Sequence, residues 1–171
     1  KIGDKKHILD LSQKNAQYYR FEHLKQLKIV DPERHSNRIL QQLQQDLRLK
    51  EMPNHIECFD NSNLQGSNPV ASCVVFKHAK PAKNEYRHFH IKTVEGPNDF
   101  ASMEEVVFRR YKRLIDEKLD LPNLIIVDGG KGQLSSAVKS LELLNIADKI
   151  AIIGIAKRLE EIYYPDDSIP L

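Results

Sequence analysis

Three aspartates in this sequence stand where a carboxylate could take part in chemistry, and Asp128 is the most informative of them. It follows the aliphatic run 124–127 and precedes Gly129 and Gly130. An acid in that position lies at the carboxyl end of a buried parallel strand, where open α/β sheets bind their ligands. The two glycines lack side chains that would block a phosphate approaching the carboxylate. From this motif alone, Asp128 is also a reasonable cap for the following helix.

Asp60 is the second candidate, because it also ends an apolar strand, residues 55–59. Taken alone, the run 60–63 is also ordinary turn chemistry. The topology predicted below, however, places this strand beside and parallel to the Asp128 strand. Two carboxylates on adjacent strands repel each other unless a cation lies between them. Because all-oxygen ligands suit Mg²⁺ or Mn²⁺, the pair predicts a divalent-metal site.

A third carboxylate and a basic cluster lie between these two acids in the sequence. Asp99 precedes a long amphipathic helix, where it could supply a ligand or simply cap the helix. Arg109 and Arg110 begin a basic run that extends to Arg113 and could hold phosphates without reading base sequence. The same run is equally consistent with a solvated helix face.

Other chemistries are excluded because their motifs are missing. Residues 129–132 resemble a phosphate-binding loop, but Gln133 stands where GxxxxGK[ST] needs a metal-binding hydroxyl. There is no Gly-x-Ser-x-Gly elbow and no Cys/His pair that would indicate covalent catalysis. The seven histidines show no metal-binding spacing, and we interpret His88 and His90 as solvated side chains on one strand face.

Composition predicts a folded, cytoplasmic protein. The chain has 171 residues, of which 40% are hydrophobic, and its net charge is only +2. This apolar content is enough for a core. No apolar run approaches the roughly 20 residues that span a membrane, and the N-terminus lacks the pattern of a signal peptide. Cys58 and Cys73 are too few for a disulfide framework and are predicted to be reduced.

Two regions are predicted, a helical segment at 1–52 and an α/β domain at 53–171. In the first, apolar residues recur at three- and four-residue intervals until residues 52–54 interrupt the pattern. In the second, strands are predicted at 55–59, 70–76, 86–93, 124–127 and 150–155. One helix, of about 18 residues, follows Asp99, and another spans 132–144. The order β-β-β-α-β-α-β predicts a mixed five-stranded sheet with helices on its faces.

Several blocks of sequence carry a resemblance to a known family. They lie at 56–63, 69–76, 86–87, 96–103 and 109–111, followed by the run IVDGGKGQL at 126–134. In this order the blocks resemble the nuclease domain of the UvrC excinuclease family, and the last block is highly specific. The helical first 50 residues resemble the family's connecting region more weakly.

The resemblance implies a ribonuclease-H-like domain of bacterial nucleotide excision repair. Such a domain makes the 5′ incision beside damaged double-stranded DNA after the companion protein UvrB has marked the lesion. Asp60, Asp99 and Asp128 match the family's catalytic acids and would bind Mg²⁺ or Mn²⁺. Lys131 matches the family motif and, with Arg109 and Arg110, is expected to contact DNA phosphates. UvrB is expected to bind a part of the protein outside this chain.

The sequence also departs from the family pattern. Asn63 stands where many members carry histidine, and Asn98 replaces the first acid of a frequent Asp-Asp pair, which leaves Asp99 to act alone. The family's catalytic histidine and its terminal DNA-binding repeats are expected beyond Leu171, so this chain alone is predicted to have little activity.

Two other functions are compatible with the residues. One is a nuclease of the same fold but of the resolvase or transposase type. The other is a non-catalytic module that binds DNA or a protein partner. The three acids disfavour the second, because a binding module has no reason to gather negative charge where phosphates must approach.

Overall fold

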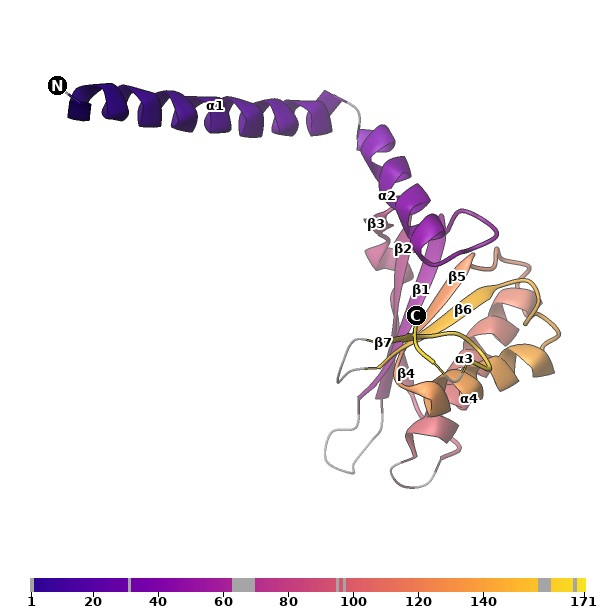
Figure 1. Cartoon of the computed structure of the whole chain (residues 1–171). Helices are drawn as coiled ribbons and strands as arrows, with labels where there is room; N and C mark the ends of the chain where they lie inside the picture. Colours follow the sequence, from indigo (N-terminus) through magenta and orange to yellow (C-terminus); the bar gives the residue numbers. More distant parts are fainter. Residues whose placement is uncertain are drawn as a thin grey trace. The chain divides into compact units, whose positions relative to one another are not determined.

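The computed structural model describes residues 2–30, 32–62, 70–94, 96, 98–156, 161–167 and 169–171 (Figure 1). The chain divides into two compact units, Lys1–Ile39 and Leu40–Leu171. The first unit is helical: it contains α1, Ile2–Val30, and the first part of α2, Pro32–Asp46. Several apolar side chains of α1 are more than half exposed, namely those of Ile8, Leu9, Leu11, Tyr18 and Tyr19.

The observed division falls after Ile39, whereas the sequence predicted a boundary after residue 52. The difference arises because residues 40–49 contribute to the core of the second unit. Leu40 and Leu47 are buried, and Leu47 packs against Leu124 and Ile153 of the sheet. The tyrosine at 164 reinforces this contact, since its hydroxyl donates to the carbonyl of Leu47 at 2.8 Å.

The second unit is built on a mixed sheet that has seven strands within the described residues. Their order is β3-β2-β1-β5-β6-β7, and β4 also pairs with β2. The strands are β1 His55–Ser62, β2 Val70–Lys77, β3 Lys80–Pro81, β4 Arg87–His90, β5 Leu124–Asp128, β6 Ala151–Ala156 and β7 Glu161–Tyr163. A short 3-10 helix, Lys83–Glu85, lies between β3 and β4. The predicted hairpin strands and parallel crossover strands are confirmed, and the predicted sheet of five strands gains two short strands, β3 and β7.

Two helices cover one face of this sheet (Figure 1), α3 at Asp99–Asp116 and α4 at Lys131–Leu143. The buried side of α3 presents Met103, Val106, Val107, Tyr111 and Leu114 to the core. Phe100 and Ile115, near the two ends of the same helix, are 56% and 39% exposed. The Phe100 ring instead lies over Gly132, where an added Cβ would come within 2.3 Å of it. A side chain at position 132 would therefore require the exposed Phe100 ring to move.

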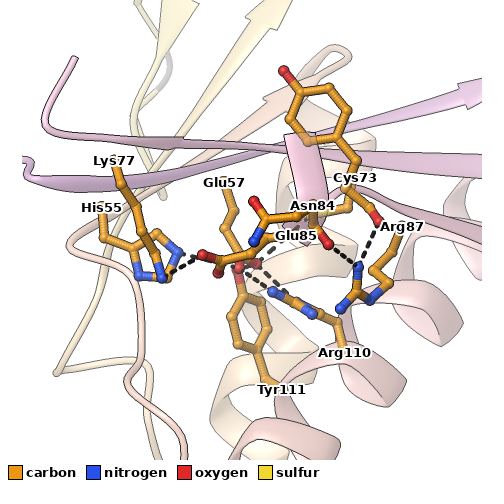
Figure 2. A network of polar contacts seen from close by, with 10 residues as sticks. His55, Glu57, Cys73, Lys77, Asn84, Glu85, Arg87, Arg110 and Tyr111 are labelled. Carbon is orange, nitrogen blue, oxygen red and sulfur yellow. Dashed lines mark hydrogen bonds and ion pairs between the residues drawn. The ribbon is translucent and has the colours of Figure 1, made fainter. Parts of the chain in front are cut away.

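A buried ion pair joins α3 to β1 on the covered face. Figure 2 shows Glu57 surrounded by His55, Cys73, Arg110 and Tyr111. The Glu57 carboxylate accepts hydrogen bonds from Arg110 Nη2 at 2.5 Å, from Arg110 Nε at 3.2 Å and from the Tyr111 hydroxyl at 3.0 Å. His55 Nε2 lies 3.4 Å away, and the Cys73 thiol donates at 3.7 Å. Glu57 is fully buried and Arg110 is 6% exposed.

These neighbours keep Glu57 charged in the core. Burial alone raises the pKa of the Glu57 carboxyl, but His55, Arg110 and Tyr111 more than reverse this and lower it to about 2. Burial and the charge of Glu57 also raise the pKa values of Tyr111 and Cys73. Both groups therefore stay protonated and continue to donate to the carboxylate.

Replacing Arg110 with methionine should destabilise the second unit by about 3–5 kcal/mol, because the change leaves a charged carboxylate unpaired in the core. Urea denaturation measures this loss. Arg113→Met is the matched control, since Arg113 is exposed and pairs with Glu117 one turn along α3. The control should change the free energy of unfolding by no more than about 0.5 kcal/mol. Equal losses in the two variants would contradict the assignment of the buried pair.

The pH dependence of stability should also report on Glu57. Its pKa falls from the ordinary value of 4.5 to about 2 on folding, so its stabilising contribution is present above pH 4.5 and is lost as the pH falls toward 2. Unfolding free energies of the wild type and Glu57→Gln, measured between pH 6 and pH 3, should therefore converge in acid. A difference that stays constant over this range would show that Glu57 is not paired in the folded state.

Candidate active site

The register between β1 and β5 brings two of the predicted acids together. The two strands are parallel, and Asp60 is paired directly with Asp128. Adjacent strands lie about 4.8 Å apart, and paired residues direct their side chains to the same face. Both aspartates are half-buried; Asp128 is the last residue of β5, and Asp60 lies two residues before the end of β1. The structure therefore has the predicted parallel pairing of these two strands, with the two acids directly opposite each other.

Alternation along β1 places Asp60 on the face opposite Glu57. Residues 57 and 59 turn toward α3, and Phe59 packs against Tyr111. Residues 58 and 60 turn to the other face, where burial and then the charges of Asp128 and Asp60 raise the pKa of the Cys58 thiol to about 11. Cys58 and Cys73 are free thiols in the structure.

Asp99 is the first residue of α3, and it does not cap the helix. That role belongs to Asn98, whose side-chain oxygen accepts a hydrogen bond from the Ala101 amide at 3.1 Å. Asn98, where the family often has an acid, and not Asp99 therefore satisfies this helix end. The strand bearing Asp60 is tied to this helix end, because Asn61 Nδ2 donates to the Asp99 carbonyl at 3.0 Å.

The glycines after Asp128 have different surroundings. A Cβ added at Gly129 would lie 1.4 Å from the Gln133 side-chain oxygen, so the space beside Gly129 is filled by that amide. A Cβ added at Gly130 would meet nothing within 4 Å. The prediction that these glycines leave room for a phosphate therefore applies to Gly130 alone. Gln133 would block a phosphate at Gly129 unless its side chain turned away.

The donor chemistry of the pair fits a hard divalent cation. Asp60 and Asp128 offer carboxylate oxygens, and Mg²⁺ usually takes one or two carboxylates and completes its shell with water and substrate oxygens. Within the described part of the chain, no three His, Cys, Asp or Glu side chains gather in a group that could hold a metal. The hydrogen bond from Asn61 places Asp99 near the end of β1. Asp99 does not, however, form one cluster with the other two acids.

The basic residues predicted to contact DNA occupy three different settings. Arg110 is buried against Glu57, so its predicted contact with a phosphate is wrong: the guanidinium is committed to the core.

Arg109 is partly exposed and donates to Glu105 at 2.7 Å and to the His90 carbonyl at 2.9 Å. Lys131 begins α4, with its Nζ 4.9 Å from the centre of the Tyr163 ring. Further along α3, Lys112 and Arg113 pair with acids one turn away, as a solvated helix face does.

The mixed sheet, its two covering helices and a carboxylate pair at the ends of adjacent parallel strands together define a ribonuclease-H-like domain. A family model described as the UvrC RNase H endonuclease domain matches residues 44–171. The chain belongs to this family. The match begins close to the point where the structure divides the chain, and it includes residues 44–49, which pack on the sheet.

Curated relatives agree with this assignment. The UvrABC system protein C of Flavobacterium psychrophilum is 72% identical over 170 residues, which is 99% of this chain and 28% of that protein. The protein of the same name from Porphyromonas gingivalis is 56% identical over 169 residues, again 99% of this chain and 28% of that protein. The chain therefore spans little more than a quarter of the length of these relatives.

Among solved structures, endonuclease V of Ciona intestinalis, in complex with a 24mer DNA containing an inosine followed by a ribo-adenosine, aligns with 63% of this chain. The alignment covers 48% of that protein, with 19% identity and a TM-score of 0.45.

Within the described residues, no helix combines the length and apolar character that a membrane span requires.

Two features of the site were missed from the sequence. Asn61 was treated only as part of a turn, although it links the strand of Asp60 to α3. Glu57 was treated as part of an apolar strand, although it is the centre of a buried polar network. A sequence signal existed for Glu57: it shares strand parity with the core residue Phe59, and a charged residue at such a position needs a partner such as Arg110.

Mg²⁺ or Mn²⁺ should stabilise the chain, because a cation between Asp60 and Asp128 relieves their repulsion only in the folded state. At ten times its dissociation constant, the metal should raise the melting temperature by about 3 °C. Thermal unfolding with and without millimolar metal measures the effect. Asp128→Asn should remove most of it, whereas Asp116→Asn, an equivalent change at an exposed position on α3, should not. An unchanged wild-type melting temperature would contradict the paired geometry.

Proposed function

We propose that this domain makes the 5′ incision beside a lesion in double-stranded DNA, as the divalent-metal-dependent endonuclease of a UvrABC nucleotide excision repair system. The observation that carries the proposal is the direct pairing of Asp60 with Asp128 on parallel strands. It is supported by membership of an endonuclease domain family and by relatives named UvrABC system protein C. UvrB is the proposed partner, which marks the lesion and engages a part of the protein outside these residues.

Each residue of the proposed site is assigned a role from its position. Asp60 and Asp128 would hold Mg²⁺ or Mn²⁺, which supplies Lewis acidity for hydrolysis of a phosphodiester bond. Asp99, at the start of α3, would orient the attacking water or a further ligand. Gly130, two residues after Asp128, has open space where a side chain would stand. Lys131, beside it, would hold a phosphate oxygen through its ammonium group.

Removing a carboxylate of the pair should abolish 5′ incision while the fold persists, because each acid is a ligand and not a core group. Even partners that only orient metal ligands are worth about 10–100-fold, so Asp60→Ala and Asp128→Ala should each cost at least about 100-fold. The assay is incision of a damaged duplex by a protein spanning the full length of the curated relatives, with UvrB present. Near-normal cutting by either variant would exclude the proposed site.

Two further variants sharpen this test. Asp116→Ala removes an exposed acid whose partner is Lys112, and it should cut like the wild type. Asp99→Ala should also impair cutting. Because Asp99 lies outside any three-residue cluster of the described residues, we expect its loss to be smaller than that of Asp60 or Asp128. Circular dichroism of each variant establishes that the fold is retained.

A further inference from the structure

The acid pair belongs to a longer row of residues that crosses the sheet. In β4 and β2, His88 is paired with Ser72, and Ser72 is paired with Asp60 in β1. Asp60 is in turn paired with Asp128 in β5. Because directly paired residues turn to the same face of a sheet, all four side chains leave the sheet on one side. The row therefore runs from the carboxylates toward β4, the edge of the sheet beside β2.

This side of the sheet is opposite the helices. The residues that alternate with the row, such as Phe59, Cys73 and Val127, are buried against α3 and α4. On the face of the row, residues 43–49 cover the beginnings of β1 and β5 through contacts with Ile56, Leu124 and Ile126. At the β4 end, by contrast, His88 and its strand neighbour His90 are exposed, and Ser72 is half-buried. The row is thus reachable from solvent on the β4 side of the acids.

The distance between His88 and the two acids suits His88 to binding DNA and not to the chemical step. His88 is two strands from Asp60, or about 10 Å at the usual strand separation. That is too far for its imidazole to act on a phosphorus atom bound at Asp60 and Asp128. It is, however, a suitable distance from which to contact phosphates further along the same DNA strand.

His88 and Ser72, the two members of this row that are not acids, are hydrogen-bond donors that add no negative charge. An imidazole carries at least one N–H in every protonation state, and a serine hydroxyl carries one O–H. Both donate to phosphate oxygens, and such contacts position a duplex without reading its sequence. A nuclease that must act beside lesions in any sequence needs contacts of this kind, and Arg110 of α3 cannot supply one because it is buried against Glu57.

We infer that His88 and Ser72, with His90 beside them, form a binding site for the sugar-phosphate backbone of the DNA strand next to the scissile phosphate. The inference rests on the proposed function, which places the scissile phosphate at Asp60 and Asp128. It assigns the β4 edge of the sheet as the path by which that strand leaves the catalytic centre. The histidines, interpreted from the sequence as solvated, thereby acquire a role through their place in the sheet.

The test compares three histidine variants in a protein spanning the full length of the curated relatives. His88→Ala should raise KM for damaged duplex, and the dissociation constant for a short duplex at low salt, by about 3- to 10-fold, the worth of one hydrogen bond to phosphate. The kcat should stay within about twofold. His88→Gln keeps an N–H donor and should restore most of the affinity. His78→Asn, in the turn after β2, should match the wild type.

Each other outcome would overturn the inference. A lower kcat with unchanged KM would place His88 in the chemistry, and unchanged values of both would leave it without a role in DNA binding. Equal losses in His88→Ala and His88→Gln would point to the shape of the ring instead of its N–H donor. The binding measurement requires no cutting. If the wild type failed to incise, the proposed function would fall, while the affinities would still decide the role of His88.

Discussion

The pairing of β1 with β5 is the constraint on which the rest of the site depends. Side chains alternate between the two faces of a sheet, so a slip of one residue would send Asp60 into the core and leave Asp128 alone. The register is held by what lies on each face: Phe59 and Val127 beneath α3 and α4, and Ile56 and Leu124 beneath residues 43–49. Burial on both faces thus makes the position of the two carboxylates a consequence of packing.

The buried Glu57 shows the same alternation with the opposite result. It precedes Asp60 by three positions, so one acid faces the helices and the other faces the opposite side. In the core a carboxylate is tolerated only with a charged partner and further donors, and Arg110, Tyr111 and Cys73 provide these. Asp60 faces a like charge, Asp128, instead. One strand therefore carries an acid paired within the core and, on the opposite face, an acid of the proposed metal site.

Much of this arrangement could be predicted from the sequence, because its signals are local. Aliphatic runs ending in an acid located β1 and β5, and the amphipathic pattern after residue 98 located α3. The predictions that failed depend on contacts between residues far apart in the sequence. Arg110 lies in a basic run, and nothing nearby in the sequence shows that its partner is Glu57, 53 residues away. Strand β7, three residues long, is too short to give a periodic pattern. The side-by-side placement of His88, Ser72 and Asp60 follows only from strand register, which periodicity does not specify.

The way in which the domain uses its arginines and lysines has a consequence for selectivity. Arg110 is committed to the core, and Lys112 and Arg113 are balanced by neighbouring acids, so a net charge of +2 leaves little attraction for a polyanion. A chromosome offers an enormous excess of undamaged phosphates, all of which compete for any basic surface. On the proposed function, this domain by itself would spend little time on intact DNA. Its cutting would then depend on delivery to the lesion, and its low affinity for undamaged DNA would limit cuts elsewhere.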